Sequence, residues 1–169
     1  GIVQSESDVA FAVDTVVLCI QPGSGDSLQF MKAGIMELPD VVAVTKADMG
    51  APARRARADV EGALSLARLS GEHPSAQVVM VSASDGTGIG DLVAACDAHA
   101  SASLSAGRLD LRRREQHLKW VEDAVRDRFG RRGLSVCDVS SALARGKGPF
   151  TAILHLDRTL EERMKGTRI

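Results

Sequence analysis

Three apolar runs of strand length occur along the chain, at residues 14–20 (DTVVLCI), 41–45 (VVAVT) and 77–81 (QVVMV). Stretches with the spacing of amphipathic helices follow them, at residues 27–38, 52–69 and about 89–99. Strands that are apolar along their whole length and alternate with helices are typical of a parallel sheet covered on both faces. The sequence therefore predicts an α/β fold in which helices form a layer on each side of a parallel sheet.

The last third of the chain has a different pattern. Residues 100–110 (ASASLSAGRLD) are small and polar, which indicates a linker or a frayed helix end. Residues 111–132 then place Leu118, Val121, Val125 and Phe129 on one face of a helix. This spacing predicts a long amphipathic helix that ends near Gly130 or Gly133. We expect an α/β part over residues 1–104 and a helical extension over residues 105–169.

Composition limits the classes of partner. Hydrophobic residues make up 44% of the chain and charged residues 25%, as in ordinary globular proteins. The formal net charge of −1 gives no overall attraction to nucleic acid or anionic lipid. With one Trp and no Tyr, a stacking platform for single-stranded nucleic acid is not indicated. No apolar run approaches the roughly 18 residues of a transmembrane helix, so we expect neither a nucleic-acid nor a membrane partner.

Cysteine and histidine positions give no sign of a metal site. Cys19, Cys96 and Cys137 are far apart, which indicates no C-x-x-C pair and no disulfide framework. We predict that Cys19 and Cys96 are buried as small hydrophobic residues and that the protein is cytoplasmic. The four histidines share no ligand spacing, so each is predicted to be a surface or helix-capping residue: His73, His99, His117 and His155.

A TKAD segment, residues 45–48, directly follows the second apolar run. Open α/β proteins bind ligands where the chain leaves the carboxyl ends of parallel strands. A carboxylate there can accept hydrogen bonds from the ring N–H and the exocyclic amine of guanine, a pair that adenine does not offer. We expect Asp48 to select the base, Lys46 to lie along the purine face and Thr45 to tie the turn to neighbouring loops. The alternative is a plain turn in which Asp48 caps the following helix.

A second loop, SAS at residues 82–84, follows the third apolar run. The backbone N–H of Ala83, between Ser82 and Ser84, can donate to the carbonyl oxygen of guanine. Two such loops at consecutive strand ends favour a guanine site. The GTGIG segment that follows lacks the Lys and Ser or Thr of a phosphate loop. Its three glycines are therefore predicted to turn the chain and pack it closely into the next helix: Gly86, Gly88 and Gly90.

Four blocks of the sequence together resemble the MeaB/ArgK family of P-loop G proteins. They are GIVQSE (1–6), PGSGDSLQFMKAGIMELPDVVAVTKAD (22–48), SASDGTGIGDL (82–92) and RRREQHLKWVEDAVRDRF (112–129). The resemblance implies a three-layer, Rossmann-like GTPase domain with a helical extension used in dimerisation. It also implies a GTPase that acts as a chaperone, gating cofactor loading or protection of an adenosylcobalamin-dependent acyl-CoA mutase such as methylmalonyl-CoA mutase.

The resemblance also assigns roles near the start of the chain. Gly1 matches the glycine that ends the family's ExxG element, which senses the γ-phosphate, and the adjoining switch contains Gln4, Ser5 and Glu6. The P-loop and the Mg²⁺ ligands would precede Gly1, so we expect this chain to be a C-terminal part. We expect it to bind GTP or GDP weakly by itself. No catalytic residue is assigned within it.

A further segment is implied to couple the nucleotide state to the partner, through Asp26, Gln29 and Lys32. Three positions depart from the family pattern. Val3 replaces a second glycine, Ser27 replaces a Glu in the coupling segment, and Thr45 replaces the commoner Asn of the base-reading turn.

Two other functions remain open from the sequence. One is an interaction module that keeps the fold and the helical extension but uses no nucleotide. The other is a related G protein for metal insertion, which usually adds a Cys/His cluster that is not found here.

Overall fold

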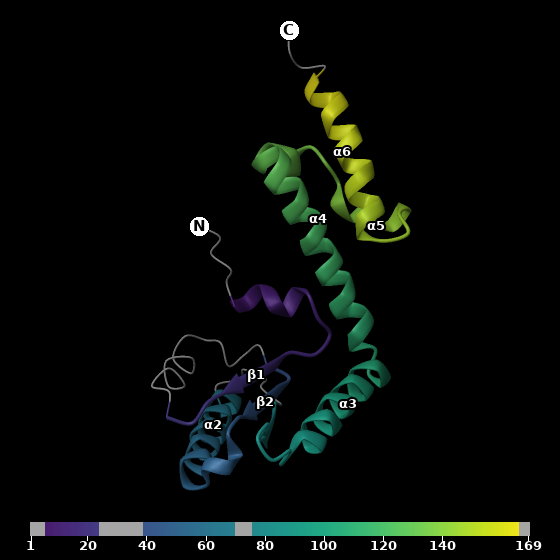
Figure 1. The fold of residues 1–169 in the computed structure, drawn as a ribbon. Coiled ribbons are helices and arrows are strands. Elements are labelled where there is room, and N and C mark those ends of the chain that lie inside the picture. Colours follow the sequence, from purple (N-terminus) through teal and green to yellow (C-terminus); the bar gives the residue numbers. More distant parts are fainter. Residues whose placement is uncertain (1–5, 24–38, 70–75, 166–169) are drawn as a thin grey trace. The chain divides into compact units, whose positions relative to one another are not determined.

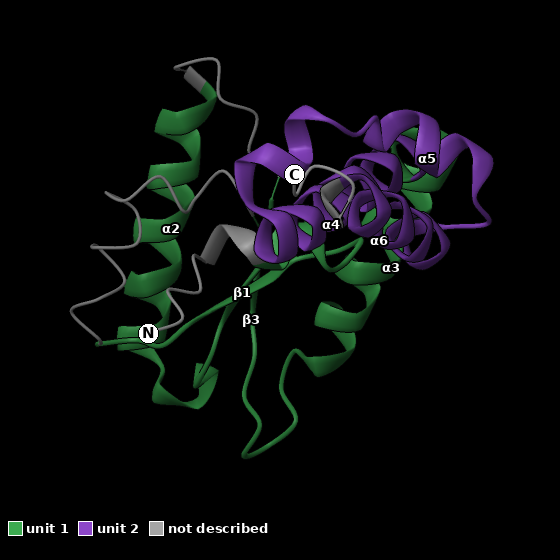
Figure 2. Cartoon of the chain, turned by 90° about the horizontal axis from the view of Figure 1, so that it is seen from above, with its two compact units in different colours: residues 1–109 green, residues 110–169 purple. Residues whose placement is uncertain are grey.

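The computed structural model describes residues 6–23, 39–69 and 76–165. Three strands form one parallel sheet in the order β1-β2-β3 (Figure 1). Their bounds are Val17–Ile20 for β1, Val41–Val44 for β2 and Gln77–Met80 for β3. The chain divides into two compact units, residues 1–109 and residues 110–169 (Figure 2), which we call unit 1 and unit 2.

In unit 1, helices α2 (Ala51–Leu69) and α3 (Ile89–Ser105) lie on opposite faces of the sheet (Figure 2). Successive strand residues point to opposite faces, so Val42 packs towards α2 while Val41 and Ala43 pack towards α3. The α2 side contains the buried residues Ile20, Val42, Val60, Leu64 and Ala76. The α3 side contains Val41, Ala43, Val79, Val81 and Ala95. The predicted α/β architecture, with a helical layer on each side of a parallel sheet, is confirmed.

Two of the sequence predictions for unit 1 are not confirmed by the structure. The helix expected at residues 27–38 lies outside the described residues. Residues 100–110 were expected to form a linker or a frayed end, but α3 continues to Ser105 and the next helix begins at Arg108. The Ala-rich composition sustains helix, and Gly107, with φ of 68°, makes the turn between the two helices. Arg108 Nη2 donates to the carbonyl of Ala102 at 3.2 Å across this turn.

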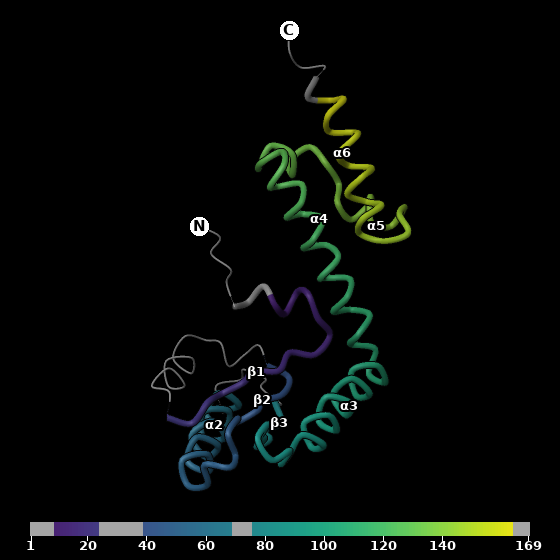
Figure 3. Tube along the Cα trace, in the orientation of Figure 1, coloured from purple at the N-terminus to yellow at the C-terminus, as the bar shows by residue number. Residues whose placement is uncertain are grey.

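Unit 2 is built from helices that follow one another along the chain (Figure 3). They are α4 (Arg108–Ser135), whose first residues belong to unit 1, α5 (Val139–Arg145) and α6 (Pro149–Lys165). Their core is centred on the fully buried Val121, Val125 and Leu160. The predicted end of the long helix near Gly130 or Gly133 agrees with the structure. Gly130, with φ of 65° and ψ of −166°, breaks the helical backbone, and a second helical stretch continues from there to Ser135.

Polar and aromatic contacts join the helices of unit 2. Asp138 caps α5 by accepting hydrogen bonds from the backbone N–H of Ser141 at 3.0 Å and from its hydroxyl at 2.6 Å. These bonds, with the hydroxyl contributing most, hold the Asp138 pKa below its usual value. The Trp120 ring lies 6.0 Å from His117 and 6.3 Å from Phe150, centroid to centroid.

The prediction that Cys19 is buried is wrong. Cys19 is exposed on β1, which lies at an edge of the sheet among the described strands. Cys96 lies on α3 and is partly buried against the core on that side of the sheet. Among the described residues, no helix combines the length and the apolar character needed to cross a membrane.

Candidate functional site

The TKAD turn leaves β2 at its carboxyl end and is fixed to both neighbouring strands. The backbone N–H of Thr45 donates to the carbonyl of Ile20 at 2.8 Å, and the Thr45 hydroxyl donates to the same oxygen at 3.1 Å. On the other side, the N–H of Ala47 donates to the carbonyl of Val81 at 3.0 Å. Thr45 thus joins the turn to the end of β1.

Asp48 lies in a single 3-10 turn, η3 (Ala47–Met49), and its side chain reaches the second predicted loop. Its Oδ1 accepts a hydrogen bond from the hydroxyl of Ser82 at 2.8 Å. The Ser82 hydroxyl also lies 2.8 Å from that of Ser84. Ser82 is fully buried, whereas Asp48 and Ser84 are exposed. The structure therefore joins the two loops through their side chains, and Asp48 is held by Ser82 and not by a helix start.

Several polar groups around this contact keep hydrogen-bonding capacity. In the part of the chain that the structure describes, three groups make no hydrogen bond: Asp48 Oδ2, the Ala83 N–H and the Lys46 ammonium. All three residues are exposed. One carboxylate acceptor and one backbone donor at adjacent strand ends form the pair that guanine requires, and the Lys46 side chain is available beside them.

The loop after Ser82 is closed by its own hydrogen bonds. The N–H of Ser82 donates to the carbonyl of Thr87 at 2.8 Å, and the N–H of Gly86 donates to the carbonyl of Ser82 at 3.0 Å. Asp85 Oδ1 accepts from the Thr87 N–H at 2.9 Å. This backbone bond is the main cause that holds the Asp85 pKa below its usual value, and the Thr87 side chain adds to it.

Gly88 fits its place because it has no side chain. Its φ is 70°, and a Cβ built there would lie 1.9 Å from the carbonyl oxygen of Met80. Close packing is thus found at Gly88, the residue that precedes α3, and the contact is to the end of β3. No atom lies within 4 Å of a Cβ built at Gly86 or Gly90, so those two glycines make no close approach.

A cavity of about 630 Å³ at the outer edge of β3 shares Ala47, Thr87 and Gly88 with the two loops. Its remaining lining comes from β3, from Arg57 of α2, and from Asp91 and three alanines of α3. Asp48, Ser82 and Ala83 do not line it. This cavity is therefore distinct from the place where a base would meet the polar groups described above.

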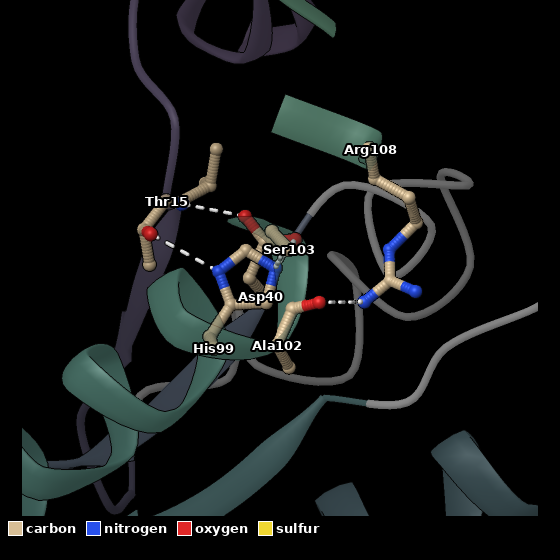
Figure 4. Close-up of polar contacts among 7 residues, drawn as sticks. Thr15, Asp40, His99, Ala102, Ser103 and Arg108 are labelled. Atoms are coloured by element: carbon tan, nitrogen blue, oxygen red, sulfur yellow. Dashed lines mark hydrogen bonds and ion pairs between the residues drawn. The ribbon is translucent and has the colours of Figure 1, made fainter. Parts of the chain in front are cut away.

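A second polar cluster, at the amino ends of the strands, was missed by sequence reasoning (Figure 4). The His99 ring on α3 places Nδ1 3.0 Å from the Thr15 hydroxyl and Nε2 3.2 Å from Asp40 Oδ1. Ser103 Oγ also lies 3.2 Å from Nε2. Asp40 Oδ2 accepts from the backbone N–H of Val16 at 2.8 Å. The prediction of a surface or capping role for His99 is wrong, because its side chain is only 21% exposed and bridges three segments.

The other predicted functional residues cannot be placed around these loops. Gly1, Gln4, Ser5, Asp26, Gln29 and Lys32 lie outside the described residues. Glu6 begins the 3-10 helix η1 (Glu6–Phe11), but its side chain is not described. Over residues 6–23, 39–69 and 76–165, no group of three or more His, Cys, Asp or Glu side chains is arranged to hold a metal ion.

Comparison with known proteins gives a family. The family model described as "Methylmalonyl Co-A mutase-associated GTPase MeaB" matches residues 1–136. A mouse protein named "Methylmalonic aciduria type A homolog, mitochondrial" is 36% identical over 129 residues, which are 75% of this chain and 31% of the relative. A probable GTPase of Mycobacterium tuberculosis is 38% identical over 129 residues, 75% of this chain and 38% of the relative.

The GTPase ArgK of Escherichia coli is 32% identical over 123 residues, which cover 72% of this chain and 37% of the relative. This chain thus spans about a third of the length of these relatives. The family match extends over the sheet, the loops at residues 45–48 and 82–84, and the whole of α4. On this evidence the chain belongs to the MeaB family of GTPases.

Proposed function

We propose that this chain supplies guanine recognition to a GTPase that gates cofactor loading or protection of an adenosylcobalamin-dependent acyl-CoA mutase, such as methylmalonyl-CoA mutase. The observation that carries the proposal is the Asp48 carboxylate, held by the buried Ser82 hydroxyl next to the N–H of Ala83. The family description, which names methylmalonyl-CoA mutase, and the GTPase names of the relatives support it.

The recognition chemistry follows from the groups at the two strand ends. Asp48 accepts hydrogen bonds from the ring N–H and the exocyclic amine of guanine, while the Ala83 N–H donates to the carbonyl oxygen of the base. Lys46 contributes its aliphatic stem along the purine face. Thr45 contacts Ile20 and thereby fixes the turn that presents Asp48. An adenine base offers neither the acceptor nor the paired donors, so these contacts select guanine.

The proposal assigns base recognition, and not attack on the γ-phosphate, to the described residues. In GTPases the phosphates are held by a P-loop and by Mg²⁺, which neutralises the charge that develops during transfer. Within the described part of the chain no cluster of metal-ligating side chains is present. Coupling to the mutase is proposed for Asp26, Gln29 and Lys32, together with the switch residues at positions 1 and 4–6. Residues 105–169 are proposed as a dimerisation arm.

Asp48→Asn tests the proposal in the full-length protein. The amide nitrogen would face the donors of guanine, so we expect the GTP affinity to fall by about 2 kcal/mol or more. Xanthine carries an oxygen in place of the exocyclic amine, and it should therefore gain affinity relative to guanine in this variant. Calorimetric titration with GTP and with XTP measures both changes.

Asp97→Asn is the matched control, because Asp97 is an exposed carboxylate on α3 and lies outside both loops. It should leave both affinities unchanged. If Asp48→Asn also leaves the GTP and XTP affinities unchanged, the turn is structural and the interaction module without a nucleotide becomes the better explanation.

A further inference from the structure

The hydrogen bonds around Ser82 have a determined direction. Ser82 has a single hydroxyl proton and lies 2.8 Å from two oxygens, Asp48 Oδ1 and Ser84 Oγ. An ionised carboxylate has no proton to donate, so the Ser82 proton goes to Asp48. The Ser82 oxygen must then accept, and the Ser84 hydroxyl must donate to it. The proton order runs from Ser84 through Ser82 to Asp48.

We propose that Ser84 is a positioning residue for guanine selection, which acts through Ser82 on the Asp48 carboxylate and does not itself contact the base. The inference rests on the proposed function. Within that function it gives Ser84 a positioning role and no contact with guanine. Sequence reasoning placed Ser84 in the second loop of the predicted guanine site, whereas the structure directs its hydroxyl to Ser82.

Burial makes this contribution difficult to replace. Ser82 is 0% exposed, so in this structure its oxygen takes its hydrogen bond from Ser84 and not from solvent. A buried acceptor without a donor is unfavourable, and the Ser82 hydroxyl is then free to turn away from Asp48. A hydroxyl that accepts a hydrogen bond is also a stronger donor, because chained hydrogen bonds polarise one another. Loss of the Ser84 hydroxyl should therefore leave the Asp48 carboxylate less well oriented to accept from both the ring N–H and the exocyclic amine of guanine.

The experiment compares GDP with IDP in the full-length protein, since inosine lacks the exocyclic amine and makes one hydrogen bond fewer with Asp48. Ser84→Ala should lower the preference for GDP over IDP by about two- to tenfold, the range for one lost hydrogen bond. Ser84→Thr keeps the hydroxyl and should restore the preference to within about twofold. Ser105→Ala removes a hydroxyl that contacts only helix carbonyls and should leave the preference unchanged.

The outcomes separate this inference from the proposed function. An unchanged ratio for Ser84→Ala, while Asp48→Asn still weakens GDP binding, overturns the role of Ser84 and leaves guanine recognition intact. Equal weakening of GDP and IDP by Ser84→Ala also overturns it, because a general loosening of the loop does not distinguish the two bases. If Asp48→Asn has no effect on either nucleotide, the proposed function itself fails.

Discussion

Lys46, in the turn that carries Asp48, adopts a left-handed backbone conformation. Lys46 has φ of 54° and ψ of 46°, and over the described residues it is the one non-glycine position with positive φ. A left-handed conformation costs a residue with a Cβ roughly 1–2 kcal/mol. The left-handed conformation of Lys46 is part of the turn that brings Ala47 and Asp48 into contact with the residues after β3. Strain of this kind is often found at ligand-binding turns.

Gly88→Ala is expected to destabilise unit 1 strongly. The new Cβ would lie 1.9 Å from the Met80 carbonyl oxygen, at a φ of 70° that is itself unfavourable for alanine. We expect a loss of at least about 3 kcal/mol, the range for a forced steric clash combined with backbone strain. Urea unfolding followed by circular dichroism measures the loss.

Gly86→Ala is the matched control, because Gly86 has a similar φ of 78° but no atom within 4 Å of the added Cβ. It should cost only the conformational strain of about 1–2 kcal/mol. Equal unfolding midpoints for the two variants would contradict the close approach of Gly88 to Met80.

At the scale of the elements, the His99 cluster fastens α3 to the starts of β1 and β2. If Nε2–H donates to Asp40, the neutral ring must accept at Nδ1, and the Thr15 hydroxyl then supplies the proton. An imidazolium form also fits, with Thr15 as the acceptor. In either form, one side chain satisfies polar groups from segments that are far apart in sequence.

His99→Ala should loosen the amino ends of the strands. The substitution leaves Asp40 Oδ1 and the Thr15 hydroxyl without the imidazole, which we expect to lower the local opening free energy by about 1–3 kcal/mol. Hydrogen exchange followed by mass spectrometry should show faster exchange at Val16, whose N–H donates to Asp40, and along β2.

His155→Ala is the comparison variant, since His155 is an exposed histidine of α6 in unit 2. Exchange in β1 and β2 should be the same as in the unsubstituted protein. Unaltered exchange at Val16 in His99→Ala would show that the cluster does not hold the strands.

The elements that sequence predicted well are those with a strong local signal. Continuous apolar runs indicated all three strands, and the start of α2 followed from its helix-forming residues. Features that depend on contacts between distant segments were not predictable. The burial of His99 depends on Asp40 and Thr15, and the exposure of Cys19 depends on the position of β1 at a sheet edge. For the site, sequence could nominate Asp48 and Ser82 but not the direction of the hydroxyl bonds between them.

At the scale of the whole molecule, the chain contains two units with separate buried cores. The cores of unit 1 lie on the two faces of the sheet, and the core of unit 2 lies among α4, α5 and α6. No residue belongs to the cores of both units among the clusters formed by the described residues. A substitution in one core should therefore affect that unit first.

Val125→Ala removes two methyl groups from a fully buried position in unit 2. We expect the opening free energy of that unit to fall by about 2 kcal/mol. Hydrogen exchange should become faster in α4 and α6 and stay the same in β2. Val42→Ala, which is fully buried in unit 1, should give the reverse pattern. Faster exchange in both units for either variant would show that they unfold as one.

The position of Trp120 decides what an optical experiment on this protein can detect. It is the chain's one tryptophan, the chain has no tyrosine, and its ring packs against His117 and Phe150 within unit 2. Intrinsic fluorescence is therefore a reporter of the helical unit. A melting curve recorded by emission can be complete while the sheet that carries Asp48 is still folded. A tryptophan introduced by Met49→Trp, at a half-exposed position next to Asp48, would give the turn that carries Asp48 an optical signal of its own.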